Sequence, residues 1–348
     1  MAAKTSNLTT LPRDCWYAMA LSSAVNHQPF AIPFEGGELV ATRTQHGSVV
    51  VRRARCAHRG CSLSGGWIEN GHLTCPYHGW QYDDNGQCVH IPALRQEESI
   101  PARARVDALP AQEAHGLVWV WIAGEHTQPT SGVEEIPELK LPGMTHQPNA
   151  DLSFTFQTHF SRSIENGIDP THAPFTHGGS IGKVDSTANL VFPSYEVAQT
   201  ERTLFSRMPI KVKKLRGIAK WLLRGDAEDI YKAYRFIYPN LLLSLVNFGR
   251  FTLVSLQAHV PTGGTSTLML STNSRNFLRN KPLLTSWFNR VTVKTGDKIA
   301  LEDDDVIKTQ NPPSVAFKGS NDILVASDLI LIEFRKMMRK RLQTNHEE

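Results

Sequence analysis

The sequence predicts an α+β protein, in which an all-β N-terminal domain is followed by a domain that combines an antiparallel sheet with helices. Three observations carry this prediction. Residues 14–124 hold short β-rich runs separated by turn signals, residues 125–149 are rich in Pro, Thr and charge, and residues 150–344 mix strand-like with helical stretches. The length of 348 residues also fits two domains, since domains usually run to about 100–200 residues.

Strands in the N-terminal domain are expected where β-branched and aromatic residues gather between glycines and prolines. Val49–Val51 and Leu117–Ile122 are such runs. Gly-Gly and Asn-Gly pairs favour tight turns, and they recur at the spacing of short strands, at positions 36–37, 65–66, 70–71 and 85–86. The next segment contains four prolines, which favours an extended linker between the domains.

The pattern of the sequence changes at residue 151, because strand-like and helix-like stretches both occur from there on. Polar and apolar residues alternate from Leu152 to Phe160, as in a half-buried strand. Periodicity and composition predict the remaining elements as a helical stretch at 161–173, strands within 234–260 and at 266–272, and helices at 283–301 and 322–344.

Composition excludes several classes of protein. The 37 basic and 33 acidic side chains give a formal charge of +4, too small to indicate nucleic-acid binding. Five cysteines in 348 residues do not make a secreted disulfide scaffold. The N-terminus lacks the basic and apolar regions of a signal peptide, and the longest apolar candidate, Leu241–Val246, is too short to span a bilayer. We therefore expect a soluble protein of a reducing cytoplasm.

Two cysteines and two histidines form a first constellation on two predicted loops. Cys56 is followed by His58, and Cys75 by His78, so each loop offers one thiolate and one imidazole. A Cys₂His₂ set also suits zinc, but zinc fingers pair Cys with Cys and His with His. A Rieske [2Fe–2S] cluster places two Cys on one iron and two His on the other, which mixed loops supply.

The segments that contain these ligands, CAHRGCSLSGG and CPYHGWQYDDNGQC, closely resemble Rieske domains. The resemblance implies that the two cysteines and two histidines bind the cluster. Rieske proteins of respiratory and photosynthetic complexes carry an extra Cys in each loop, and these two form a disulfide. Here Cys61 stands at the first position but Tyr77 at the second, so the chain resembles the oxygenase type.

A second constellation lies further along the chain, where His172 and His177 are five residues apart. Pro174 is expected to end a helix between them, which leaves both imidazoles facing one point. Two imidazoles and a carboxylate on one face of an iron leave positions open for O₂. Alone, two such histidines favour ordinary surface or core residues. Downstream of a Rieske pair, however, the run that includes Asn166 and Asp169 resembles the iron-site motif of Rieske non-haem iron oxygenases.

The third iron ligand is expected to be a carboxylate well downstream. Residues 301–310 resemble the family pattern of Glu-Asp, two residues, two apolar residues, two residues and Gln. That register implies Asp303 as the ligand. Asp304 and Asp305 stay open as alternatives, and the ordinary interpretation of the remaining acids is a solvated helix face.

The resemblance covers the chain from about Trp16 to Leu342 and points to the homotrimeric branch of O- and N-demethylases and monooxygenases. It implies a helix-grip-like C-terminal domain, a Rieske cluster, a mononuclear Fe²⁺ and O₂ as co-substrate. Members of this family form head-to-tail trimers that bring the cluster of one subunit beside the iron of the next. Asp169 is then the expected bridge between His172 and a cluster histidine of the neighbour, with Asn166 supporting the iron from outside its ligand set.

Electrons are expected from NAD(P)H through a separate ferredoxin or flavin reductase, because no Gly-rich dinucleotide fingerprint follows a strand in this sequence. Basic residues at 211–224 are interleaved with apolar ones at roughly helical spacing. Their ordinary interpretation is the solvated face of an amphipathic helix, and the alternatives are a lid over the substrate entrance, a reductase-docking surface or a membrane-surface contact.

The function expected from this resemblance is hydroxylation or oxidative demethylation of an aromatic or polycyclic small molecule. Two alternatives remain, a cis-dihydroxylating ring dioxygenase and a Rieske electron-transfer protein without a second iron site. The substrate pocket is expected to be lined by residues from about 200 to 295, mostly apolar with a few polar anchors.

Overall fold

The computed structural model describes residues 11–178, 192–209, 230–278 and 281–344. The chain divides into two compact units, one formed by Asp14–Val133 with Pro261–Gly263 and the other by the rest of the chain. Each unit is described by itself. The basic segment at 211–224 lies outside the described residues.

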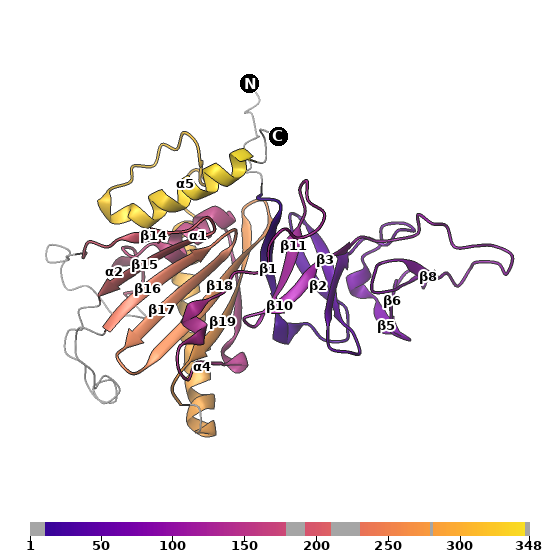
Figure 1. Cartoon of the computed structure of the whole chain (residues 1–348), viewed down its shortest axis with the longest axis horizontal. Coiled ribbons are helices and arrows are strands. Elements are labelled where there is room, and N and C mark those ends of the chain that lie inside the picture. The colour runs from indigo at the N-terminus through magenta and orange to yellow at the C-terminus, as the bar shows by residue number, and fades with distance from the viewer. Residues whose placement is uncertain (1–10, 179–191, 210–229, 279–280, 345–348) are drawn as a thin grey trace. The chain divides into compact units, whose positions relative to one another are not determined.

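The N-terminal unit is all-β and contains three antiparallel sheets, with strand orders β1-β11-β10, β2-β3-β4-β9 and β5-β6-β7-β8 (Figure 1). All six residues of β11 are buried, and β11 pairs with β1 on one side and with β10 on the other. The strands are β1 (Cys15–Leu21), β2 (Phe30–Phe34), β3 (Gly37–Arg43), β4 (Val49–Arg53), β5 (Trp67–Glu69), β6 (His72–Thr74), β7 (Gln81–Tyr82), β8 (Cys88–His90), β9 (Ala108–Leu109), β10 (Ala111–Ala114) and β11 (Leu117–Ile122), with 3₁₀ turns η1 (Ser22–Ala24) and η2 (Leu63–Gly65).

Two of the predicted tight turns join neighbouring strands, one at the predicted residues 70–71 and one a residue earlier than the predicted pair 36–37. Asn70 and Gly71 join β5 to β6 with φ of 51° and 82°, and Glu35 and Gly36 join β2 to β3 with φ of 50° and 74°. Positive φ at both central residues is the type I′ geometry, which matches the twist of the strands it connects.

The C-terminal unit is built on an eight-stranded antiparallel sheet of order β12-β19-β18-β17-β16-β15-β14, in which β13 also pairs with β19. The strands are β12 (Thr145–His146), β13 (Leu152–Phe156), β14 (Val197–Gln199), β15 (Thr203–Pro209), β16 (Ile230–Ile237), β17 (Leu241–Phe248), β18 (Thr252–Gly263) and β19 (Ser266–Arg275), and the helices are η3 (Pro137–Lys140), η4 (Pro148–Ala150), α1 (Phe160–Ile168), α2 (Ala173–Thr176), α4 (Pro282–Ile307), η7 (Ala326–Asp328) and α5 (Leu329–Thr344).

Helices α4 and α5 pack on different parts of this sheet (Figure 1). The long helix α4 contacts β13 and α1, and α5 contacts β14, β15 and α1. Phe334 of α5 is fully buried, and its ring meets that of Phe236 on β16 edge-to-face at 5.0 Å. The α+β fold class predicted from the sequence is confirmed.

Two local predictions are wrong in detail. The predicted strand from Leu152 to Phe160 ends at Phe156, because His159 caps the N-terminus of α1 by accepting a hydrogen bond from the Ser161 amide. Pro174 lies in the first turn of the short helix α2 instead of ending a longer helix. Proline suits the first turn of a helix, where its missing N–H costs no hydrogen bond.

The segment predicted as a linker takes part in the C-terminal sheet, since β12 pairs with β19. The boundaries predicted for the two domains, 14–124 and 150–344, stay predictions. Among the described residues, no helix is long and apolar enough to cross a membrane.

Candidate metal centres

The two loops that carry the predicted cluster ligands have the same backbone design. The Cys56 amide donates to the Cys61 carbonyl, and the Cys75 amide donates to the Trp80 carbonyl five residues on. In each loop a glycine amide, that of Gly60 or Gly79, donates back to the cysteine carbonyl. Both glycines have positive φ, 71° and 70°, a conformation that favours glycine.

This design places the thiols inside and the imidazoles outside. Cys56 and Cys75 are 3% and 1% exposed, while His58 and His78 lie at the surface with ring centroids 4.6 Å apart. Burial is the main cause that raises the pKa of Cys56, and contact with Cys75 adds to it. Two adjacent buried thiols facing two adjacent imidazoles fit a cluster whose inner iron takes sulfur and whose outer iron takes nitrogen.

Two aromatic residues support the cluster site. The Tyr82 hydroxyl accepts a hydrogen bond from the Ala57 amide at 3.1 Å, which leaves its proton to be donated to Cys56 Sγ at 3.0 Å. The Trp80 indole stacks on the His58 ring at 4.7 Å with an interplanar angle of 2°. All five cysteines are free, and Tyr77 is exposed beside Cys61's loop, so no disulfide joins the two loops.

Replacing Tyr82 by Phe is expected to lower the reduction potential of the cluster. A hydrogen bond to a cluster sulfur stabilises the reduced, more negative state, so its loss favours the oxidised state. A net hydrogen bond of about 1 kcal/mol corresponds to roughly 40 mV for one electron. A spectroscopic redox titration measures the shift. The matched control is Tyr77→Phe, which removes an exposed hydroxyl near the cluster; an equal shift in both variants contradicts the prediction.

The C-terminal unit brings the three predicted iron ligands together. His172 and His177 flank the short helix α2, and Asp303 comes from the last third of α4. Their ligand atoms all lie within 4.8 Å of one another. Asp303 Oδ1 is 3.2 Å from His177 Nε2 and 3.6 Å from His172 Nε2. This oxygen is buried and has no hydrogen-bond partner among the described residues, which fits a site built for a cation.

Each histidine of this site faces a carboxylate with its other ring nitrogen. His177 Nδ1 is 3.1 Å from Glu302 Oε2, and His172 Nδ1 is 3.6 Å from Asp169 Oδ2. Both rings are thereby turned so that Nε2 points at Asp303. Metal-binding histidines commonly donate their second N–H to a carboxylate, which fixes the tautomer. Glu302 was not predicted in this role, although its place directly before Asp303 is a usable signal.

The three adjacent acids, at positions 303 to 305, make different contacts in the structure. Asp303 alone faces the two histidines, and the Asn166 side chain donates a hydrogen bond to it. Asp304 Oδ1 accepts the Gln157 amide at 2.7 Å, which ties α4 to the residue after β13. Asp305 is exposed and pairs with Lys308. Burial, the largest influence, raises the pKa of Asp303 although the two imidazoles act to lower it.

Asp169, the predicted bridge, ends helix α1 and is held firmly. Its Oδ1 accepts hydrogen bonds from both the amide and the hydroxyl of Thr171, each at 2.7 Å. Burial raises the pKa of Asp169, but the contacts with His172 and Thr171 outweigh it, and the net pKa is lowered. The distance of 3.6 Å between Asp169 Oδ2 and His172 Nδ1 is longer than a normal hydrogen bond. Oδ2 therefore has acceptor capacity left for another donor.

A buried ion-pair network fixes helix α1 beneath these residues. Glu165 binds Arg335 of α5, and both Arg335 and Arg162 bind Asp322 at 2.7 and 2.8 Å. Hydrogen bonds from the two arginines, that of Arg162 first, lower the pKa of Asp322 to about 2. Glu165 and Arg335 are 170 residues apart in sequence, so this support for helix α1 could not be predicted from the sequence.

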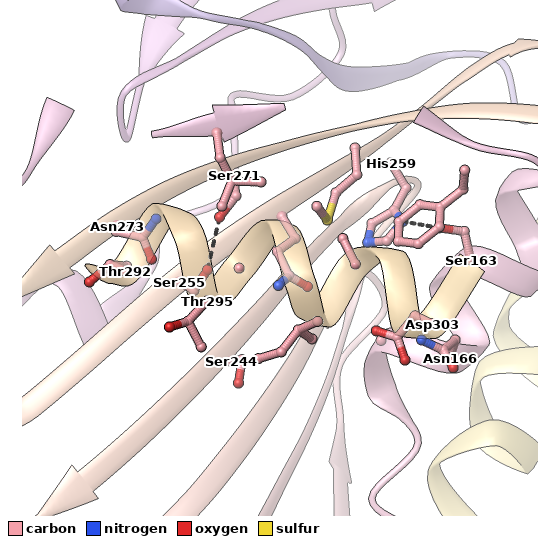
Figure 2. A pocket seen from close by; sticks show the side chains of 18 of the residues that line it. Ser163, Asn166, Ser244, Ser255, His259, Ser271, Asn273, Thr292, Thr295 and Asp303 are labelled. Atoms are coloured by element: carbon pink, nitrogen blue, oxygen red, sulfur yellow. Dashed lines mark hydrogen bonds between the residues drawn. The ribbon is translucent and has the colours of Figure 1, made fainter. Parts of the chain in front are cut away.

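A cavity of about 350 Å³ opens beside Asp303, between α4 and the strands of the sheet (Figure 2). Ser163, Asn166, His259 and Asp303 lie at one end of it. Apolar side chains and Gln257 also line it, and the other end carries hydroxyl and amide groups. Strands β17 to β19 and residues 291–295 of α4 supply lining within the predicted range of about 200 to 295. Residues of α1 and β13, and α4 from Gly296 to Asp303, supply lining outside that range.

Curated relatives are roughly a third identical to this chain over about half of its length. Aminopyrrolnitrin oxygenase PrnD of Pseudomonas fluorescens is 35% identical over 175 residues, 49% of this chain and 47% of PrnD. The 3-chlorobenzoate-3,4-dioxygenase oxygenase subunit of Comamonas testosteroni is 31% identical over 173 residues, 49% of this chain and 39% of that subunit. The chain thus spans less than half the length of either relative.

Solved structures match over nearly the whole chain. Dicamba monooxygenase bound to dicamba has a TM-score of 0.79 at 20% identity, covering 97% of this chain and 99% of that one. NdmA of Pseudomonas putida CBB5 with caffeine has a TM-score of 0.75 at 21% identity, covering 94% of this chain and 90% of NdmA. At this level of identity the likeness shows the fold.

Two protein families match successive parts of the sequence. Residues 15–110 match the Rieske [2Fe-2S] domain, and residues 156–344 match the vanillate O-demethylase oxygenase C-terminal domain. The first family carries the [2Fe–2S] cluster and the second the mononuclear iron, and the donor sets described above fit both groups. The resemblance inferred from the sequence is confirmed: the chain belongs to the Rieske oxygenases whose C-terminal domain is that of the vanillate O-demethylase oxygenase.

Proposed function

We propose that this chain is the terminal oxygenase component of a Rieske non-haem iron monooxygenase, which hydroxylates or oxidatively demethylates an aromatic or polycyclic small molecule. The observation that carries the proposal is the site of two histidines and Asp303 at one end of a cavity of about 350 Å³. Two imidazoles and one carboxylate leave positions on an iron open for O₂, and the cavity offers a place for the substrate next to it.

The chain's own residues have definable tasks in such a reaction. When bound, the mononuclear iron supplies the coordination of O₂ and the cluster supplies electrons singly. Glu302 and Asp169 hold the imidazoles in the orientation that a metal needs. The apolar side chains of the cavity, among them Phe156 and Met269, take up the apolar part of a substrate.

Several relatives are named for aromatic substrates, which supports an aromatic substrate here. They include 3-chlorobenzoate-3,4-dioxygenase, a putative toluene-4-sulfonate monooxygenase and dicamba monooxygenase bound to dicamba. The dioxygenase relative keeps cis-dihydroxylation as the second candidate, since its oxygenase subunit is 31% identical over half of this chain. Chloroplast proteins are also among the relatives, so a cytoplasmic location is itself a proposal.

Electron supply is proposed to come from NAD(P)H through a separate ferredoxin or flavin reductase, in a homotrimer. Asp169, with acceptor capacity left on Oδ2, supports a contact with a donor from another subunit. The trimer stays a prediction that sedimentation of the purified protein tests directly.

Metal analysis and oxygen uptake together test the proposed function. An oxygenase carries about three irons per chain, whereas a pure Rieske carrier carries about two. Oxygen uptake with a surrogate reductase, screened against methoxylated, N-methylated and polycyclic compounds, then identifies the substrate class. Formaldehyde release marks demethylation, and a cis-diol product marks the dioxygenase. Two irons per chain and no substrate-dependent oxygen uptake would refute the proposal.

A further inference from the structure

The cavity beside the iron site contains a buried histidine that the proposed reaction has not used. His259 lies on β18, is 2% exposed and lines the cavity. Its Nδ1 is 2.6 Å from Ser163 Oγ of helix α1. Its Nε2 has no hydrogen-bond partner among the described residues. Burying a polar atom without a partner is unfavourable, and water or a ligand can offset that cost.

The hydrogen-bond network assigns the tautomer of His259. The Ser163 hydroxyl is buried, and the only acceptor recorded for its proton among the described residues is His259 Nδ1. The carbonyl one turn earlier on α1, that of His159, already accepts the amides of Arg162 and Ser163. If Ser163 donates to Nδ1, the ring proton resides on Nε2. His259 therefore presents an N–H donor, not an acceptor, at its unpartnered nitrogen.

This donor is uncharged under ordinary conditions. Burial lowers the pKa of His259 to about 3, because the imidazolium loses its hydration and gains no counter-ion. The Phe156 ring lies parallel to it, with ring centroids 6.4 Å apart. An uncharged N–H recognises an acceptor by hydrogen-bond geometry and requires no full negative charge on it.

His259 Nε2 faces the end of the cavity that contains the iron ligand. A side-chain carbon at Gly167 would lie 3.7 Å from His259 Nε2 and 3.8 Å from Gln257 Oε1 and would clash with Leu242 Cδ1, so the backbone of α1 passes close to His259 at this point. Gly167 directly follows Asn166, whose amide binds Asp303. Figure 2 shows His259, Ser163, Asn166 and Asp303 gathered at this end. A molecule bound to His259 is thus held beside the iron site.

The opposite end of the cavity is polar in another way. Ser255 and Ser271 share a hydrogen bond of 3.0 Å, and Asn273 and Thr292 lie nearby (Figure 2). Gln257 lies between Ser255 and His259 along β18, and apolar side chains such as Met269 also line the cavity. Polar contacts at both ends of a partly apolar cavity fix the orientation of an elongated ligand.

We propose that His259 is a substrate-positioning residue, whose Nε2–H donates a hydrogen bond to an acceptor atom close to the oxidised carbon. The substrate class is thereby narrowed to aromatic or heterocyclic molecules with a carbonyl, carboxylate or ring-nitrogen acceptor at that end. This inference rests on the proposed function for the meaning of the cavity, but ligand binding tests it separately.

Binding is measured by titration calorimetry on the full chain carrying both metals, without reductase. The probes are matched aromatic pairs that differ in one acceptor, such as 4-methoxyacetophenone and 4-isopropylanisole, extended to fused rings and N-heterocycles. We expect the acceptor-bearing member to bind about tenfold more tightly, a preference that His259→Phe abolishes and His259→Gln, which keeps an N–H donor, partly restores. Ser163→Ala weakens the preference, because the tautomer is no longer fixed.

Ser244→Ala is the matched control, since it removes a cavity hydroxyl elsewhere. It is expected to leave the preference unchanged. Melting temperature and iron content identify any variant that fails to fold, and His259→Gln then carries the test. The inference is overturned if His259→Gln and the native chain lack the preference, if His259→Phe keeps it, or if no pair binds. Oxygen uptake, measured separately, decides the proposed function whichever result is obtained.

Discussion

Asp303→Asn is expected to lose the mononuclear iron while the Rieske cluster stays in place. Asp303 Oδ1 is the buried oxygen that faces both histidines, and it has no other partner among the described residues. An amide in its place has neither the charge nor the affinity of a carboxylate for iron. Iron content should fall from about three to about two per chain, and turnover by more than about 100-fold.

The same substitution at the two neighbouring acids provides matched controls. Asp304→Asn keeps an oxygen that can accept the Gln157 amide, and Asp305→Asn alters an exposed ion pair worth about 0–1 kcal/mol. Both variants should retain all their iron. Elemental analysis gives the iron content, and the visible and paramagnetic spectra report the cluster. Loss of iron in Asp304→Asn or Asp305→Asn, with iron retained in Asp303→Asn, would move the ligand to another acid.

Motif spacing predicts the candidate metal ligands because the features that mark them are local. Each loop of the N-terminal unit carries its own Cys, His and turn glycine, so a few residues define the geometry. The three acids in a row were harder, because register alone favoured Asp303. Only the fold shows that Asp304 is used by the Gln157 amide and that Asp305 is exposed, and these contacts span up to 147 residues.

The residues that sequence reasoning missed act through long-range contacts. His259 has no metal-ligand neighbour in the sequence, and its partner Ser163 is 96 residues away. The pairing of Glu165 with Arg335 likewise depends on the packing of α5 on α1. The errors at Phe160 and Pro174 were local, because alternation and a proline each fit two structures. The His159 cap of α1 decides the first case, and the place of Pro174 in the first turn of α2 decides the second.

Asp169→Asn is expected to keep both metals and yet nearly stop turnover. Asn has the same shape and keeps an oxygen for the two Thr171 hydrogen bonds, so the end of helix α1 should remain in place. The charge facing His172 Nδ1 is lost, and so is the acceptor capacity of Oδ2. If Asp169 connects His172 to a cluster histidine of a neighbouring subunit, the path for electrons between the two metals is weakened while both remain bound.

Two measurements distinguish a bridge from a mere support of the iron. Iron content should stay at about three per chain, and the pre-reduced cluster should be reoxidised by O₂ and substrate at least about 100-fold more slowly in a single turnover. Asp297→Asn, an exposed acid on α4, serves as the matched control and should react like the native chain. Loss of iron would show that Asp169 acts by holding His172, and unchanged reoxidation would remove the bridge altogether. Because the net pKa of Asp169 is lowered, its carboxylate is ionised throughout the neutral range. The loss of turnover in the Asp169→Asn variant should therefore be the same at every pH in that range.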